Sequence, residues 1–352
     1  MSRSRKTWVC SLLLLSLPLL ILPAVPRPAR ADGWPQTGSA ACAVLEASSG
    51  RLLYAENGEQ PLPPASTCKI ATALLTLALT DDLQRPVVIS EAAAAVGESS
   101  IDLRAGEVLS VADLLRGALI RSGNDACFAL AEAVAGSEPL FVHWLNLQAL
   151  LLGAYSACFR NTNGLPAAGH LISAADLARL TARALLQPFF ADTVASKYAE
   201  LGGESNYRYY RNTNRLLWQD ERVAGVKTGT TDEAGPCLVA ALREGEALYI
   251  SVVFNCPDRY GASLRLLEEA AARGLLLRPV RRGQALAVCR GELLYAARDA
   301  VLLLSEGEAG AVRLRWELPG RLLFLDEQGR ELARVPLTSA SAPAGSTRPV
   351  PN

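Results

Sequence analysis

Apolar residues along residues 38–278 follow two different periods, which predict strands near both ends of this stretch and helices between them. Apolar runs bounded by turn residues predict strands over residues 40–46, 51–55, 222–230, 236–245 and 247–255. Apolar positions at helical spacing predict helices over residues 66 to about 81, most of 90–135, 138–152, 173–186 and 261–276. Strands from the two ends of a domain can join in one sheet, so the pattern favours an α/β domain of the α+β kind with helices packed on the sheet.

The pattern changes after residue 278. Short strand-like stretches separated by turns predict a small all-β module over residues 279–337. The last stretch, 338–352, is polar and rich in proline, so it is expected to be a disordered tail.

The first 31 residues have the pattern of a secretory signal peptide. Basic residues near the start precede an apolar core over 8–25, and Ala-Arg-Ala at 29–31 supplies a small-x-small cleavage pattern. The protein is therefore expected to be exported, to the cell wall space, the periplasm or the medium. An uncleaved membrane anchor is the alternative interpretation, although Pro18 and Pro23 interrupt the apolar run.

The charge balance argues against a nucleic-acid partner. Residues 1–31 hold five of the 35 basic residues and none of the 35 acidic ones, so the mature chain would carry 30 basic and 35 acidic residues, a net charge of −5. A chain without a basic excess has little with which to neutralise a phosphate backbone.

Seven cysteines follow the expected signal segment, and their spacing gives neither a C-x-x-C pair nor a metal-like cluster with the two histidines, His143 and His170. These cysteines are Cys42, Cys68, Cys127, Cys158, Cys237, Cys256 and Cys289. An odd number outside the cytoplasm implies at least one thiol that is unpaired or shared between chains. Buried free thiols and at least one disulfide both remain open, and no zinc site is expected.

The stretch 62–80 reads LPPASTCKIATALLTLALT and contains a lysine where a helix start disfavours one. Ser66 lies at or near that start, where its hydroxyl could cap free N–H groups, with Glu or Gln expected three residues on. Lys69 stands there instead, although the helix macrodipole is positive at that end. One helical turn brings the two side chains to one face, and a lysine whose pKa is lowered by a nearby cation or a helix N-terminus can take the serine proton. A capping serine with a solvated lysine is the ordinary interpretation when this pattern stands alone.

A second polar triplet, Ser122-Gly123-Asn124, falls in a break between two expected helices. The Ser122 hydroxyl could relay a proton, and the Asn124 amide could both donate to a substrate carbonyl and orient Lys69. A helix cap followed by a turn would explain the triplet equally if it stood alone.

A third triplet, Lys227-Thr228-Gly229, lies inside an expected strand. Lys227 would supply charge, and Thr228 a hydroxyl, for a substrate carboxylate. The glycine would let a substrate backbone approach closely. Taken alone, the triplet could simply place an exposed cation on a strand.

In this order the three motifs are those of class A β-lactamases and penicillin-binding proteins. The chain further resembles the D-alanyl-D-alanine carboxypeptidase family, the low-molecular-mass penicillin-binding proteins of the S11 type, over about residues 38–278. Residues 51–75, 119–137, 159–178 and 225–241 carry this resemblance. It implies a penicillin-binding/serine β-lactamase-like fold with a mainly antiparallel sheet. Residues 320–337 look like a shortened form of the β domain that often follows the catalytic unit.

By this resemblance, Ser66 attacks the carbonyl between the two D-Ala residues that end a peptidoglycan stem pentapeptide, and the last D-Ala leaves. Lys69 acts as the base and Ser122 helps to protonate the leaving amine. The implied substrate-binding residues are Asn124, Lys227, Thr228, Gly229 and Thr230. The backbone N–H groups of Ser66 and Thr230 would form the oxyanion hole. The resemblance implies no cofactor and no metal, and it implies β-lactams as inhibitors that acylate Ser66.

Other functions on the same motifs remain possible. A class A β-lactamase would need a glutamate a few residues before an asparagine, and Glu138 and Asn146 are spaced wrongly for that role. A D,D-endopeptidase stays open, because a D-Ala carboxylate also terminates some cross-linked peptides. A non-enzymatic wall-binding protein would be expected to lack the serine or the lysine of the motifs, and this chain lacks neither.

Three departures from the family pattern qualify the expectations. Asn163 stands where many relatives have histidine, which should alter a local hydrogen bond more than the reaction. Many relatives end in an amphipathic membrane-binding helix, whereas this chain ends in SAPAGSTRPVPN, so membrane attachment is doubtful. Cys68 lies inside the S-x-x-K turn, and a bulky modification of its thiol could block acylation.

Overall fold

The computed structural model describes residues 33–280, 282–289, 292–304, 312–317 and 320–339. The expected signal segment, 1–31, lies outside the described residues, as does the expected tail beyond residue 339. The first two residues of that tail belong to the last strand, β18 (Glu331–Ser339). No helix in the described part of the chain combines the length and the apolar character needed to cross a bilayer.

A five-stranded antiparallel sheet forms the centre of the larger unit. Its strands are, in spatial order, β2 (Leu52–Glu56), β1 (Ala41–Glu46), β11 (Ala247–Phe254), β10 (Gly235–Glu244) and β9 (Val223–Thr231). All five strands were predicted, and the joining of the two ends of the domain in one sheet is confirmed. Strands far apart in sequence therefore lie side by side, with Cys42 of β1 opposite Val253 of β11.

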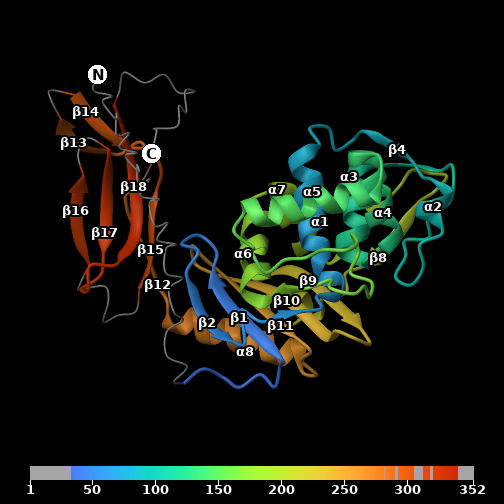
Figure 1. Ribbon diagram of the computed structural model, residues 1–352, viewed down its shortest axis with the longest axis horizontal. Helices are drawn as coiled ribbons and strands as arrows, with labels where there is room; N and C mark the ends of the chain where they lie inside the picture. The colour runs from blue at the N-terminus through green and yellow to red at the C-terminus, as the bar shows by residue number, and fades with distance from the viewer. Residues whose placement is uncertain (1–32, 281, 290–291, 305–311, 318–319, 340–352) are drawn as a thin grey trace, which may run out of the picture.

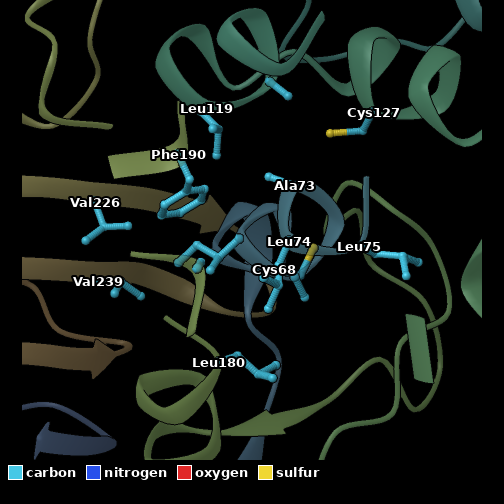
Figure 2. Packing of buried hydrophobic residues seen from close by; sticks show 14 of the residues in the cluster. Cys68, Ala73, Leu74, Leu75, Leu119, Cys127, Leu180, Phe190, Val226 and Val239 are labelled. Atoms are coloured by element: carbon cyan, nitrogen blue, oxygen red, sulfur yellow. The ribbon is translucent and has the colours of Figure 1, made fainter. Parts of the chain in front are cut away.

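Helices cover both faces of this sheet (Figure 1). Alternate residues of β1 point to opposite faces, because side chains alternate along a strand. Ala43 and Leu45 join the large core under the helical lobe, whereas Val44 joins a second core under α8 (Arg259–Arg273). Figure 2 shows the large core, in which Phe190 lies near Val226 of β9.

The helical lobe contains α1 to α7 and differs from the expected helices in its first part. Its helices are α1 (Lys69–Leu79), α2 (Glu91–Ala94), α3 (Val111–Arg116), α4 (Asn124–Ala135), α5 (Glu138–Leu151), α6 (Ala174–Ala184) and α7 (Pro188–Ala195). The prediction that most of 90–135 is helical is wrong for residues 95–110. Glu98, Asp102 and Gly106 take positive φ angles there, which a right-handed helix excludes. The strands β4 (Pro86–Val88) and β5 (Val108–Ser110) pair across this stretch.

Several further elements were not predicted. The helix α7 and the hairpin of β7 (Tyr198–Leu201) and β8 (Arg208–Arg211) occupy the interval before β9. The two-residue strands β3 (Pro61–Leu62) and β6 (Ile172–Ser173) pair with each other and tie the start of α6 to the segment before Ser66.

The C-terminal unit is all-β, as expected. Its strands are β12 (Leu275–Val280), β13 (Ala285–Cys289), β14 (Glu292–Ala296), β15 (Ala300–Leu304), β16 (Arg313–Glu317), β17 (Arg321–Leu325) and β18. They enclose a small core of their own, with Leu302, Phe324 and Val335 buried. The expected helix over 261–276 ends at Arg273, and β12 pairs with β15, so the expected domain boundary at residue 278 falls inside a strand.

Candidate active site

Ser66 lies in a 3-10 turn, Ala65–Cys68, directly before α1. Its hydroxyl makes no capping bond, so the alternative interpretation of Ser66 as a helix cap is wrong. The turn is tightly enclosed by two glycines from other segments. A Cβ atom on Gly164 would lie 2.0 Å from the carbonyl oxygen of Ala65, and one on Gly229 would lie 3.0 Å from the nitrogen of Ser66. Larger residues at either position would displace the serine.

Lys69 is the first residue of α1 and is completely buried. Its Nζ lies 2.8 Å from Ser66 Oγ, 2.8 Å from Asn124 Oδ1 and 2.5 Å from the backbone oxygen of Asn163. Burial lowers the pKa of Lys69, because removal from water penalises the ammonium form. A lowered pKa was expected from a nearby cation or a helix end, whereas desolvation is its main cause.

Lys69 Nζ has three oxygen neighbours, and it donates to Ser66 Oγ at 2.8 Å when it is protonated. Burial favours the neutral form, in which the carbonyl oxygens of Asn124 and Asn163 can accept both remaining N–H groups. The lone pair of that neutral form would then face Ser66 Oγ. This is the arrangement in which a lysine can take a proton from a serine.

Asn124 begins α4 and is held so that its oxygen faces Lys69. Its Nδ2 donates to the backbone oxygen of Gly97 at 3.0 Å, and its backbone N–H donates to that of Ser99 at 2.7 Å. The neighbouring Asp125 fixes the same loop by accepting from the Ser100 hydroxyl and from the N–H of Ile101. The non-helical loop before α3 thus positions the amide.

Ser122 follows a π-helical turn, Gly117–Arg121, and has a left-handed backbone with φ 71°. Only 6% of its surface is exposed. Gly123 makes the sharp entry into α4 possible, since a Cβ there would lie 2.8 Å from a carboxylate oxygen of Asp125. The turn therefore carries Ser122 on the same connection that positions Asn124.

Lys227 and Thr228 lie in β9, at the edge of the central sheet. Lys227 is 1% exposed and donates to the backbone oxygen of Thr228 at 2.9 Å. Burial, and next the charge of Lys69, lower the pKa of Lys227 well below its usual value. Like charges in one low-dielectric site disfavour each other's protonated forms. Binding an anion beside Lys227 would reverse part of that effect.

Three residues make contacts in this region that were not predicted from the sequence. Thr213 Oγ1 lies 2.7 Å from Thr228 Oγ1. The Arg259 guanidinium donates to the backbone oxygen of Gly229 at 2.8 Å and to the Thr230 hydroxyl at 2.7 Å. The third is the Asn163 backbone oxygen on Lys69. Each comes from a segment that only the tertiary fold brings to the motifs, although the turn at 159–170 was already singled out by its Asn163.

The cysteines near the site are deeply buried. Burial raises the pKa of Cys68 and that of Cys127 to about 12. The thiol of Cys68 is therefore protonated and shielded in the native state, which argues against the suggested block by thiol modification. The cysteines whose side chains the structure describes are unpaired.

Comparison with known proteins gives consistent matches to one family. A family model described as D-alanyl-D-alanine carboxypeptidase matches residues 29–258. The D-alanyl-D-alanine carboxypeptidase DacF of Bacillus subtilis is 38% identical over 218 residues, which are 60% of this chain and 56% of that protein. DacC of Escherichia coli is 33% identical over 80% of this chain and 72% of its own length.

The fold is shared with solved penicillin-binding proteins. The crystal structure of penicillin-binding protein 5 from Haemophilus influenzae matches with a TM-score of 0.75 and 27% identity, over 87% of this chain and 97% of that one. Penicillin-binding protein 6B from Escherichia coli matches with a TM-score of 0.71. The family match covers more than half of the chain, and both the motifs and the fold agree with it. The chain belongs to the D-alanyl-D-alanine carboxypeptidase family of serine hydrolases.

Proposed function

We propose that this protein is a serine D-alanyl-D-alanine carboxypeptidase that removes the terminal D-Ala from peptidoglycan stem pentapeptides through an acyl-enzyme on Ser66. The observation that carries the proposal is the buried Lys69, whose Nζ lies 2.8 Å from Ser66 Oγ with two acceptors on its other sides. A serine hydroxyl is a poor nucleophile until a base takes its proton, and this geometry supplies the base without a histidine.

Acylation would begin when neutral Lys69 takes the Ser66 proton and Oγ attacks the carbonyl between the two D-Ala residues. The negative oxygen of the tetrahedral intermediate would be bound by the backbone N–H groups of Ser66 and Thr230. Ser122 would pass a proton to the leaving D-Ala amine as the C–N bond breaks. Water, activated by Lys69, would then hydrolyse the ester and release the shortened peptide.

Selection of the C-terminal D-Ala would depend on its carboxylate. A carboxylate bound beside the buried Lys227 would favour its ammonium form, and Thr228 carries a hydroxyl beside it, so together they would offer charge and a hydrogen bond to that anion. Thr213 contacts the Thr228 hydroxyl, and Arg259 donates to the Thr230 hydroxyl, so both residues belong to the same region. An internal peptide bond presents no such carboxylate, so the site would favour cleavage at a chain end. Asn124 would orient Lys69 and donate to the peptide, and Gly229 would allow its backbone to approach.

A β-lactamase would differ from the proposed carboxypeptidase in its rate of deacylation, and a D,D-endopeptidase would differ in its substrate. Glu138 accepts from the Thr162 N–H and hydroxyl at 3.0 and 2.7 Å, and Asn146 bonds to backbone groups of Phe159. Both residues therefore hold the fold together, so neither supports the deacylation chemistry of a class A β-lactamase. Penicillin should acylate Ser66 and leave slowly. Endopeptidase action on cross-links ending in a D-Ala carboxylate is the second candidate.

The proposed setting is the extracytoplasmic space. The segment 1–31 has the pattern of a signal peptide, and the substrate is part of the cell wall. Peptidoglycan would be the physiological partner, β-lactams would be inhibitors, and neither a cofactor nor a nucleic acid would take part.

The test is a time course of fluorescent penicillin labelling of the mature protein, with Ser66→Ala alongside. A stable adduct that depends on Ser66 supports the acyl-enzyme, and D-Ala release from a pentapeptide then separates the carboxypeptidase from an endopeptidase. A label that appears and disappears within seconds would instead identify a β-lactamase. Folded protein without any label would overturn the proposal.

A further inference from the structure

The hairpin of β7 and β8 presents an aromatic cluster to solvent. Tyr198 and Tyr209 are 45% and 54% exposed, although both are large and partly apolar. Their rings are stacked, with centroids 5.3 Å apart and planes 17° apart. Trp218, which follows the hairpin, meets Tyr198 edge-on at 6.0 Å. We call Tyr198, Tyr209 and Trp218 the aromatic face.

A polar hollow opens beside this aromatic face. It has a volume of about 480 Å³, within the range of small-ligand pockets. It lies between α3, α7 and β7 and is lined by Arg116, Asp192, Thr193, Ser196, Tyr198 and Glu200. Tyr198 thus belongs both to the aromatic face and to the wall of the hollow.

Charges of both signs surround the two features. Arg116 in the hollow, which also pairs with Asp113 at 3.3 Å, and Arg211, whose guanidinium carbon lies 4.3 Å from the Trp218 ring centroid, are positive. Asp192 and Glu200 are negative. Charges of mixed sign with hydroxyl groups favour a ligand that is polar and carries little net charge. Nucleic-acid bases also stack on aromatic rings, but this chain has no basic excess to bind their phosphates.

We propose that the aromatic face and the hollow bind N-acetylated sugars of the glycan strand to which the stem peptide is attached. A pyranose ring presents C–H groups on its faces, which pack against the negative face of an aromatic ring. Its hydroxyl and acetamido groups would bond to the charged and hydroxyl groups of the hollow. The choice of glycan rests on the proposed function, because the carboxypeptidase substrate is a peptide carried by this polymer.

The hairpin is connected directly to the catalytic cleft. Thr213, two residues after β8 ends, lies 2.7 Å from Thr228 through their hydroxyls, and its N–H donates to the backbone oxygen of Ile120 at 3.2 Å. Ile120 precedes Ser122 by two residues. The segment that follows the hairpin is therefore held between the turn before Ser122 and β9. A glycan held there would keep its stem peptides near Ser66 and raise their local concentration.

The test uses the mature chain carrying Ser66→Ala, so that no turnover occurs. Tetramers of N-acetylglucosamine are titrated into it by calorimetry, and backbone hydrogen exchange is followed with and without the tetramer. We expect exchange to slow in the hairpin residues 198–211. The double variant Tyr198→Ala/Tyr209→Ala should weaken binding at least tenfold. Tyr155→Ala, which removes a tyrosine that is 79% exposed elsewhere, should leave binding within twofold.

A second readout separates binding from folding and from chemistry. In the background with Ser66 intact, the double variant should keep wild-type penicillin labelling and wild-type kcat/KM on a short soluble peptide, while KM on insoluble peptidoglycan rises. Unchanged tetramer binding in the double variant, or exchange that slows elsewhere but not in 198–211, would overturn the proposal. If the double variant does not fold, hydrogen exchange of the Ser66→Ala chain with and without the tetramer decides whether the hairpin binds the glycan. Tetramer binding without any D-Ala release would instead refute only the carboxypeptidase function.

Discussion

Lys69 Nζ lies 2.8 Å from Ser66 Oγ in a site from which the lysine side chain has lost all contact with water. The two residues are three positions apart, so local helix geometry is sufficient to bring them together. What the helix alone does not supply is the lowered pKa of the lysine. That shift follows from burial, which requires α4, the turn at Asn163 and the central sheet to close around the side chain.

The pH dependence of acylation should follow this lowered pKa. Lys69 acts as a base only when neutral, and burial moves its pKa below the ordinary 10.5. The rate of penicillin acylation should therefore rise with pH and reach its plateau below the pH at which a solvated lysine deprotonates. The measurement is the acylation rate constant across pH by stopped-flow fluorescence. A rate that climbs only above pH 10 would show that the lysine is an ordinary cation.

Lys69→Arg should abolish most of this reaction. A guanidinium stays protonated throughout the accessible pH range, so it cannot accept the Ser66 proton. We expect acylation to fall by a factor of about 10² to 10⁴, as for the loss of a general base. Lys197→Arg, at an exposed lysine, is the matched control and should react as the wild type does. Equal rates in the two variants would remove Lys69 from the mechanism.

Asn124→Asp should move the pH profile of acylation, because it keeps an oxygen facing Lys69 while it replaces the neutral amide, with its donor to Gly97 and to the peptide, by a carboxylate. The new carboxylate would lie about where Oδ1 now accepts from Lys69 at 2.8 Å, and an adjacent negative charge stabilises the ammonium form. The pKa of Lys69 should rise, so the acylation profile should shift to higher pH by about one unit or more. The rate at neutral pH should fall accordingly, and it should recover when the pH is raised.

Asn146→Asp provides the control for that variant. Asn146 also loses amide hydrogen bonds on substitution, to Val142 and Phe159, but it bonds no catalytic residue. We expect Asn146→Asp to lower stability and leave the pH of the acylation plateau unchanged. A shift of the same size in both variants would mean that Asn124 acts through the fold rather than through the charge state of Lys69.

Gly164→Ala should disrupt the nucleophile turn. An added Cβ would lie 2.0 Å from the backbone oxygen of Ala65, so either the turn at Ser66 or the turn at Gly164 must move. Gly153 is the matched control, because its φ of +81° resembles the +90° of Gly164 but a Cβ there meets nothing within 4 Å. Gly153→Ala should cost only the strain of a left-handed alanine, about 1–2 kcal/mol. Gly164→Ala should lower the melting temperature further and prevent penicillin labelling, which differential scanning fluorimetry and gel labelling would record.

The sequence predicted those parts of the fold and the site that depend on local spacing. The five central strands followed from apolar runs, and Ser66 with Lys69 followed from their separation by one turn. Residues 95–110 were misassigned because alanines and apolar positions suit a helix, whereas the positive φ angles at Glu98 and Asp102 arise from packing and pairing across the loop. The hairpin of β7 and β8 was missed because its outer positions are aromatic or charged and its strands are short.

The remaining site contacts depend on long-range packing. Arg259 reaches Gly229 from the start of α8, 30 residues further along the chain, because β10, β11 and α8 fold back beside β9. The Asn163 oxygen is a backbone group, and no side-chain pattern identifies it as a partner of Lys69. Contacts of this kind follow from the tertiary fold, which brings the turn and the helix together, and not from the local sequence.

Thr213→Val tests one of these long-range contacts. The substitution keeps the shape of the side chain but removes the hydroxyl that lies 2.7 Å from Thr228 Oγ1. Thr228 would then be less well oriented toward a substrate carboxylate. Loss of one neutral hydrogen bond corresponds to about 1 kcal/mol, so KM for a D-Ala-D-Ala peptide should rise about fivefold while kcat changes little. Thr213→Ser retains the hydroxyl and should keep the wild-type KM, whereas a wild-type KM in Thr213→Val would show that Thr228 is positioned by the strand alone.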